Sequence, residues 1–170
     1  MNYPLDEPSG QPAAQIAAAW ARERPGTPVS SIRVVTPLWR AAKLLADDRR
    51  RVLAEAGVDG ATLDLLATLR RSGPPYTRST RELTESCLVT AGAISQRVAR
   101  AERDGLVRRR AAGRTVLVEL TPAGHRQVES TVDMVLARET ELISALSPDQ
   151  REILAGLLDT LLADLRRRLG

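Results

Sequence analysis

Arginines crowd the stretch from residue 97 to residue 114, where they could neutralise the phosphates of a nucleic acid. Seven arginines stand there against two acids, Glu102 and Asp104, so the local balance is +5, whereas the formal charge of the whole chain is only +4. A basic stripe on a nearly neutral body is typical of a phosphate-binding surface. A solvated arginine-rich face is the alternative, and charge alone does not decide between the two.

Side chains that could read base edges lie on a helix expected over residues 91–104. Gln96 can form two hydrogen bonds to an adenine edge, and Arg100 can do the same with a guanine edge. Ser95 and the capping residue Thr90 suit phosphate or mixed contacts. The opposite face of the helix should pack inward and consists of Ile94, Val98 and Ala101. An ordinary surface helix is the alternative interpretation.

A basic β-hairpin is expected directly after this helix, with strands at residues 106–110 and 116–120. Arg114, beside Gly113 at the tip, is the candidate for insertion into the minor groove, where narrow A·T tracts concentrate negative potential. A solvated loop arginine is its alternative role. The candidates for DNA contact on the hairpin are Arg108, Arg110 and Arg114.

Two helices joined by a tight turn are expected to position the side chains that could read base edges. Ser79 and Glu82 form a capping box that opens the shorter helix, and Thr90 caps the reading helix that follows. Further upstream, Asp59 is expected to cap another helix. Downstream, Thr121 opens a long helix and a second capping box, at residues 147–150, opens the last one. Helix, turn, helix and basic hairpin together describe a winged helix-turn-helix.

The expected fold is therefore mainly α with a small β-hairpin wing, in which the N- and C-terminal helices form a dimerisation lobe. The last helix carries a leucine-rich stripe broader than one intrachain contact needs. This stripe favours a homodimer, whose two-fold symmetry matches palindromic DNA. The expected divisions are a disordered tail at residues 1–11, N-terminal helices at 12–58 for dimerisation and part of a ligand site, the DNA-binding winged helix-turn-helix at 59–121, and C-terminal dimerisation helices at 122–170.

Composition argues against several other classes of protein. One cysteine and one histidine cannot build a zinc site, and no nucleophile–base pair or phosphate loop is evident, so no metal, cofactor or enzymatic activity is expected. No apolar run is long enough to span a membrane, so a cytoplasmic protein is expected. Aromatic residues make up only 2% of the chain, which favours double-stranded DNA over single strands or RNA.

Several motifs resemble the MarR family of winged-helix regulators. They are Leu-Thr at residues 83–84, Arg-Ala-Glu-Arg-Asp-Gly-Leu-Val-Arg at 100–108 and Leu-Thr-Pro-Ala-Gly at 120–124. Trp-Ala-Arg-Glu-Arg-Pro at residues 20–25 and the segment 64–76, which ends in Gly-Pro-Pro-Tyr, extend the resemblance to the urate-responsive branch of that family. The resemblance covers about residues 16–124.

The resemblance implies a site for a purine-derived anion. By position, Trp20 would lie against the ligand ring, Arg97 would pair with its charge, Asp64 would be repelled by that charge, and Arg109 would transmit the shift to the reading helix. Each residue has an alternative role. Trp20 could pack the N-terminal helix, Asp64 could interact with a helix dipole, and both arginines could contact phosphates.

The implied function is that of a repressor released from a palindromic operator by urate or a related purine-derived anion. Two alternatives stay open: a repressor that responds to a phenolic or carboxylate anion, and a ligand-insensitive architectural winged-helix protein. The hairpin departs from the family's pattern, because the family usually carries Asp-x-Arg there, whereas residues 110–115 contain no acid. The role of Arg114 is thereby the least supported.

Overall fold

The structure is a computed structural model that describes residues 10–87, 89–113 and 115–170. The chain divides into two compact units, one ending at Val52 and the other running from Leu53 to Gly170. The expected disordered tail at residues 1–11 falls largely outside the described residues, and so does Arg114. Within the described parts, every helix is too short or too polar to span a lipid bilayer.

The first unit consists of α1 (Ala13–Glu23) and most of α2 (Ile32–Glu55), whose last turn belongs to the second unit. Pro37 lies inside α2 without ending it. Arg40 of α2 donates a hydrogen bond from Nη1 to the carbonyl oxygen of Gln11, over 2.8 Å, and so links the segment before α1 to α2.

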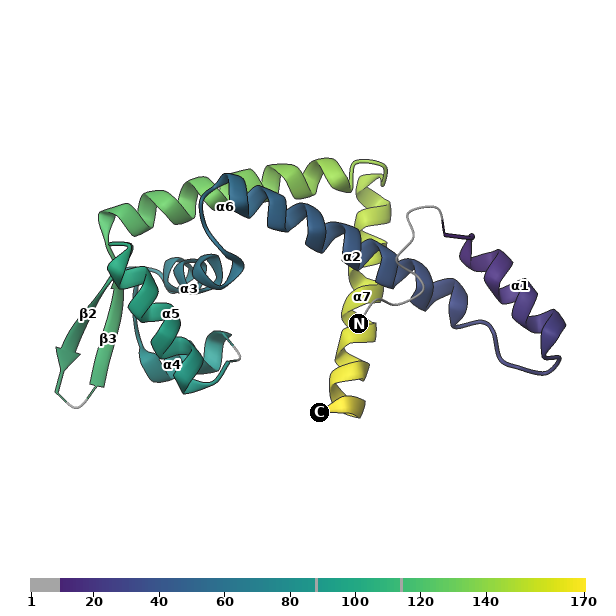
Figure 1. The fold of residues 1–170 in the computed structure, drawn as a ribbon, viewed down its shortest axis with the longest axis horizontal. Coiled ribbons are helices and arrows are strands. Elements are labelled where there is room, and N and C mark those ends of the chain that lie inside the picture. The colour runs from purple at the N-terminus through teal and green to yellow at the C-terminus, as the bar shows by residue number, and fades with distance from the viewer. Residues whose placement is uncertain (1–9, 88, 114) are drawn as a thin grey trace. The chain divides into compact units, whose positions relative to one another are not determined.

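The second unit contains the winged helix-turn-helix (Figure 1). Its elements are α3 (Gly60–Arg71), β1 (Thr77–Ser79), α4 (Thr80–Cys87), α5 (Ala91–Arg103), β2 (Val107–Ala112) and β3 (Thr115–Leu120). The predicted hairpin of β2 and β3 is present, and the sheet has a third strand that the sequence did not predict. The strand order is β1-β3-β2, with antiparallel pairing throughout.

The predicted caps position the helices of this unit. Asp59 accepts the Thr62 N–H at 2.7 Å at the start of α3, and Ser79 and Glu82 exchange hydrogen bonds at the start of α4. Each cap satisfies amides that would otherwise lack a partner, at roughly 1 kcal/mol per cap. The turn between α3 and the sheet holds Tyr76 at φ 57°, a left-handed conformation unusual for a residue other than glycine.

Two long helices complete the chain, α6 (Pro122–Leu142) and α7 (Pro148–Leu169). Thr121 caps α6 by accepting the Gly124 N–H at 3.0 Å, and Ser147 with Gln150 forms the predicted capping box of α7. No described residue of α7 is buried in the single chain. This helix therefore presents its leucines to solvent or to a partner.

The core of the second unit joins its helices to its sheet. Three leucines of α3 are completely buried, and so is one apolar side chain from each of α4, α5 and β3. These residues are Leu65, Leu66, Leu69, Leu83, Ile94 and Val118. Complete burial of such a side chain stabilises the fold by roughly 1.5–3 kcal/mol. The reading helix and the wing are thus fixed to one common core.

Candidate nucleic-acid interface and effector site

The helix α5 is anchored by one face and presents the other. Thr90 caps it, as predicted, by accepting the Ala93 N–H at 3.3 Å. Ile94, Val98 and Ala101 are buried, which confirms the predicted inward face. Because these positions recur every three to four residues, the opposite face of α5 is held outward.

A stripe of small and polar residues runs along the outward face of α5. Its members lie four, three and four residues apart and are Gly92, Gln96, Ala99 and Arg103. Gln96 and the neighbouring Ser95 are exposed. A Cβ atom at Gly92 would meet nothing within 4 Å. Small side chains beside Gln96 leave room for a bulky partner to approach the helix, as reading of base edges requires.

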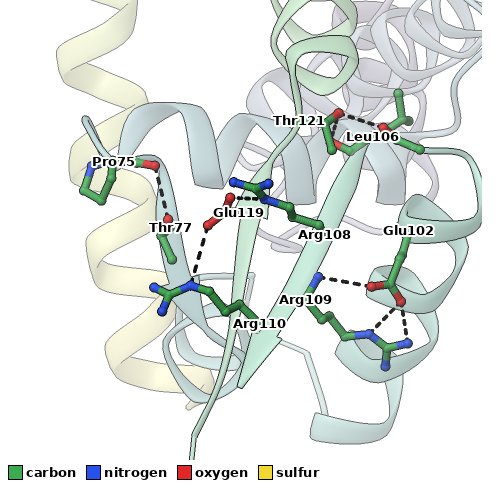
Figure 2. Close-up of polar contacts among 10 residues, drawn as sticks. Pro75, Thr77, Glu102, Leu106, Arg108, Arg109, Arg110, Glu119 and Thr121 are labelled. Carbon is green, nitrogen blue, oxygen red and sulfur yellow. Dashed lines mark hydrogen bonds and ion pairs between the residues drawn. The ribbon is translucent and has the colours of Figure 1, made fainter. Parts of the chain in front are cut away.

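The outer face of the wing carries two arginines and one carboxylate. Arg108 of β2 and Glu119 of β3 are directly opposed in the sheet, and Arg110 follows two residues on with the same facing. The Nε of Arg108 donates to Glu119, and the Nε of Arg110 lies 4.0 Å from the other oxygen of that carboxylate (Figure 2). Glu119 of β3 is thus an acid on the wing itself, and its described partners are Arg108 and Arg110.

Arg109 points to the other face of the wing, where it joins β2 to α5 (Figure 2). Its Nε donates to Glu102 of α5 over 2.7 Å, and its backbone N–H donates to the same carboxylate over 3.1 Å. The hydrogen bond from the Arg109 side chain is the main cause that holds the pKa of Glu102 below its usual range. Both groups are ionised at neutral pH, so the wing and the reading helix are linked there by a charge-assisted contact.

Two further ion pairs join α5 to α3. Arg97 lies 3.0 Å from Asp64, and Arg100 lies 2.6 Å from Asp59. The backbone N–H of Thr62 is the main cause that lowers the pKa of Asp59, and Arg100 adds to the effect. The predicted guanine reader Arg100 is thus engaged by an acid of its own chain. An outside anion that takes Arg97 from Asp64 would leave the Asp64 carboxylate without its counter-charge.

The remaining candidates are divided between the units. Trp20 lies on α1 in the first unit and is half exposed, whereas Asp64, Arg97 and Arg109 lie in the second. Within the second unit, Asp64 and Arg97 are in contact, while Arg109 pairs with Glu102. Arg114, predicted for the minor groove, lies outside the described residues.

A cavity that the sequence did not predict lies between α3 and α6. Its volume is about 530 Å³, and its apolar part is formed by Ala67, Val128 and Val132. The charged part consists of Arg70, Arg71, Glu129 and Asp133. Cavities of a few hundred Å³ with an apolar lining and a few charged groups suit small organic ligands. Two adjacent arginines at the end of a helix were the only sequence signal, and such residues more often serve the helix dipole.

The two arginines of this cavity are held differently. Arg70 donates from Nε and Nη2 to Glu129, over 3.1 and 2.7 Å, and its guanidinium lies 4.8 Å from the centre of the Tyr76 ring. Arg71 donates only to the Thr68 hydroxyl, over 3.3 Å, among the contacts of the described residues. Among the residues that the structure describes, no carboxylate pairs with the Arg71 guanidinium, so it can meet an anionic ligand without giving up an ionic partner.

Comparison with known proteins places these features in context. The family model described as "MarR family" matches residues 56–115 of the chain. The HTH-type transcriptional regulator PecS of Dickeya dadantii is 27% identical over 148 residues, which cover 85% of this chain and 89% of PecS.

Two solved structures share the fold. A mutant of MarR from E. coli, complexed with operator DNA, is 25% identical with a TM-score of 0.62, covering 75% of this chain and 95% of that protein. BpsR of Bordetella bronchiseptica, whose DNA binding is regulated by 6-hydroxynicotinic acid, is 23% identical with a TM-score of 0.67, covering 81% and 99%.

Proposed function

Because the chain belongs to the MarR family of DNA-binding transcriptional regulators, we propose that it is a dimeric repressor that a small aromatic anion releases from a palindromic operator. The observation that carries this proposal is the Asp64–Arg97 pair, which links the reading helix α5 to α3 through a charge that an anion can displace.

DNA recognition by this chain would use α5 and the wing together. Gln96 and Ser95 on α5 would approach base edges in the major groove, with Thr90 at the helix N-terminus near a phosphate. Arg108 and Arg110 share the single carboxylate of Glu119, so together they keep a net positive charge and would contact backbone phosphates from the wing. The support for this assignment is the outward, exposed placement of these side chains around a buried apolar face.

A second copy of the chain is the proposed partner of the terminal helices. Along α7, apolar side chains are strongly exposed in the single chain, with Ile153 and Leu157 each 64% exposed. Covering such side chains contributes roughly 25 cal/mol for each Å² of apolar area removed from water. A two-fold dimer would present two reading helices to successive half-sites of a palindrome.

Urate is the first proposed effector. It is a planar anion at neutral pH, so it suits a fork-shaped cation such as Arg97 and an aromatic face such as that of Trp20. Its charge would replace Asp64 as the partner of Arg97, and repulsion from Asp64 would favour displacement of α5. A coupling of this kind is typically worth about 1–3 kcal/mol and is reciprocal between ligand and DNA.

A phenolic or carboxylate anion is the second candidate, and the α3–α6 cavity is the observation that favours it. An aromatic ring would pack against Ala67, Val128 and Val132, and its carboxylate would meet Arg71. BpsR, which shares the fold, is regulated by an aromatic hydroxy acid. In this case the effector would bind Arg71 of α3. The described contact of the Arg71 side chain is with Thr68 of the same helix and not with α5.

Isothermal titration calorimetry separates the two effectors. With urate, we expect binding by the wild type and a loss of about 10- to 100-fold in affinity for Arg97→Gln, because a hydrogen bond to a charged group contributes about 1.5–3 kcal/mol. Trp20→Ala should also bind urate more weakly. Arg103→Gln removes an exposed arginine of the same helix and should bind as the wild type does, which makes it the matched control.

For the second candidate, 6-hydroxynicotinate should bind the wild type and be weakened by Arg71→Gln but not by Arg97→Gln. If neither compound binds the wild-type protein, the effector proposal is wrong, and the DNA-binding assignment is unaffected.

A further inference from the structure

The arginines near the DNA-reading face differ in one respect, the presence of a carboxylate partner. Apart from Arg103, each described arginine of α5 and β2 pairs with an acid. The pairs are Arg97 with Asp64, Arg100 with Asp59, Arg109 with Glu102, and both Arg108 and Arg110 with Glu119. Five of these arginines are thus held by four carboxylates of the protein itself.

Arg103 is the exception among these described residues. Its Nε makes a long hydrogen bond of 3.4 Å to the carbonyl oxygen of Ala99, one turn back on the same helix. The side chain is exposed, and although Asp104 is its neighbour in the chain, no ion pair joins the two in the described structure. The other donors of its guanidinium are available to an outside partner.

The position of Arg103 is also suitable for a contact with a DNA backbone. It ends the outward stripe that contains Gln96, seven residues or about 10 Å further along the helix axis. The major groove is about 12 Å wide, so a helix that places Gln96 near its floor brings Arg103 toward a phosphate at its edge.

An exchange of partners separates the two kinds of arginine. Arg100 must leave Asp59 before it can bind a phosphate, and the carboxylate that it leaves then faces the negative backbone. Arg103 gains a phosphate without losing an ionic partner. The net free energy gained from a phosphate contact is therefore larger for Arg103 than for Arg100. Arg100 instead holds α5 against α3 through its ion pair with Asp59.

We propose that Arg103 is a phosphate-binding residue of the DNA interface. Asp59 pairs with Arg100 and prevents it from contacting DNA, so that Arg100 acts as a positioning residue between α5 and α3. This inference rests on the DNA-binding function stated above. It assigns the charged contact at the C-terminal end of α5 to a residue three positions from the predicted guanine reader.

The test is the salt dependence of binding to a short duplex of random sequence, because each phosphate contact contributes about 0.9 to the slope of log affinity against log salt. Arg103→Ala should reduce the slope by about 0.9, so that raising the salt from about 50 to about 200 mM weakens it about 3.5-fold less than the wild type. Arg103→Lys keeps the charge and should keep the slope. Arg100→Ala should leave the slope unchanged.

A further variant tests the role of Asp59 directly. Asp59→Asn retains an oxygen to accept the Thr62 N–H, so the cap of α3 remains, while the charge that holds Arg100 is removed. We expect the slope to steepen by about 0.9 as Arg100 reaches a phosphate. Circular dichroism of each variant establishes that its helices are intact.

Three results would overturn the inference, each read from the slope of log affinity against log salt. They are a wild-type slope for Arg103→Ala, a slope reduced by about 0.9 for Arg100→Ala, and a wild-type slope for Asp59→Asn. Failure of the DNA-binding function itself looks different, because the wild-type protein would then bind no duplex at any salt concentration.

Discussion

Replacing Gly124 by alanine is expected to destabilise the second unit by about 3 kcal/mol or more, at the upper end of the usual cost of overpacking a core. A Cβ atom at this position would lie 2.0 Å from the carbonyl oxygen of Leu106 and 3.2 Å from the side chain of Leu120. The clash is with backbone, which cannot rotate aside as a side chain can.

The Leu106 carbonyl is also fixed in place by other contacts. It accepts hydrogen bonds from the backbone N–H and the hydroxyl of Thr121, each over 3.1 Å (Figure 2). Moving it would break the contact between the start of the wing and the start of α6. Relief of the clash therefore requires a loss of hydrogen bonds, which is why the upper end of the range is expected.

Urea unfolding at one fixed protein concentration measures this effect. Gly92→Ala is the matched control, because its added Cβ meets nothing within 4 Å and alanine favours a helix by up to about 1 kcal/mol over glycine. The control should unfold at the same or a higher urea concentration. Equal midpoints for Gly124→Ala and the wild type would contradict the packing described for α6.

Ile94→Ala is expected to lower the free energy of unfolding by about 2–5 kcal/mol, as complete burial of the removed atoms predicts. Ile94 is 0% exposed and anchors α5 to the core of the second unit. Loss of this anchor should also weaken duplex binding, because the buried face of α5 fixes the orientation of the exposed face that would meet DNA.

The same unfolding experiment with Val116→Ala is the control. Val116 is 41% exposed on β3, so its truncation should cost within about 0.5 kcal/mol. If Ile94→Ala and Val116→Ala were equally mild, the inward face assigned to α5 would be wrong.

Local signals in the sequence predicted most elements of the winged helix-turn-helix. The cap at Thr90 and the period of Ile94, Val98 and Ala101 define α5 and its buried face without reference to the rest of the chain. The alternation of residues 116–120 defines β3. The third strand β1 was missed because three residues carry no periodic signal, and Thr77–Ser79 forms a strand only through its pairing with β3.

Contacts between distant residues could not be predicted in this way. Arg100 meets Asp59, 41 residues away, and Arg70 meets Glu129, 59 residues away, because of how helices pack rather than what their neighbours in sequence are. For the same reason the sequence assigned Arg100 to guanine and left the α3–α6 cavity unseen. Asp64 and Arg97 were named together only through resemblance, and the fold places them 3.0 Å apart.

The most direct test of release by an anion is fluorescence anisotropy of a labelled operator duplex, selected by the protein from random sequences. The selected sites should be palindromic, and saturating effector should lower the affinity of the wild-type protein for them about 5- to 150-fold, which corresponds to about 1–3 kcal/mol of coupling. With urate as the effector, Arg97→Gln should respond little. An operator affinity that stays the same with saturating urate and with saturating 6-hydroxynicotinate would contradict release by an anion. A selection that enriches no sequence would contradict specific operator binding.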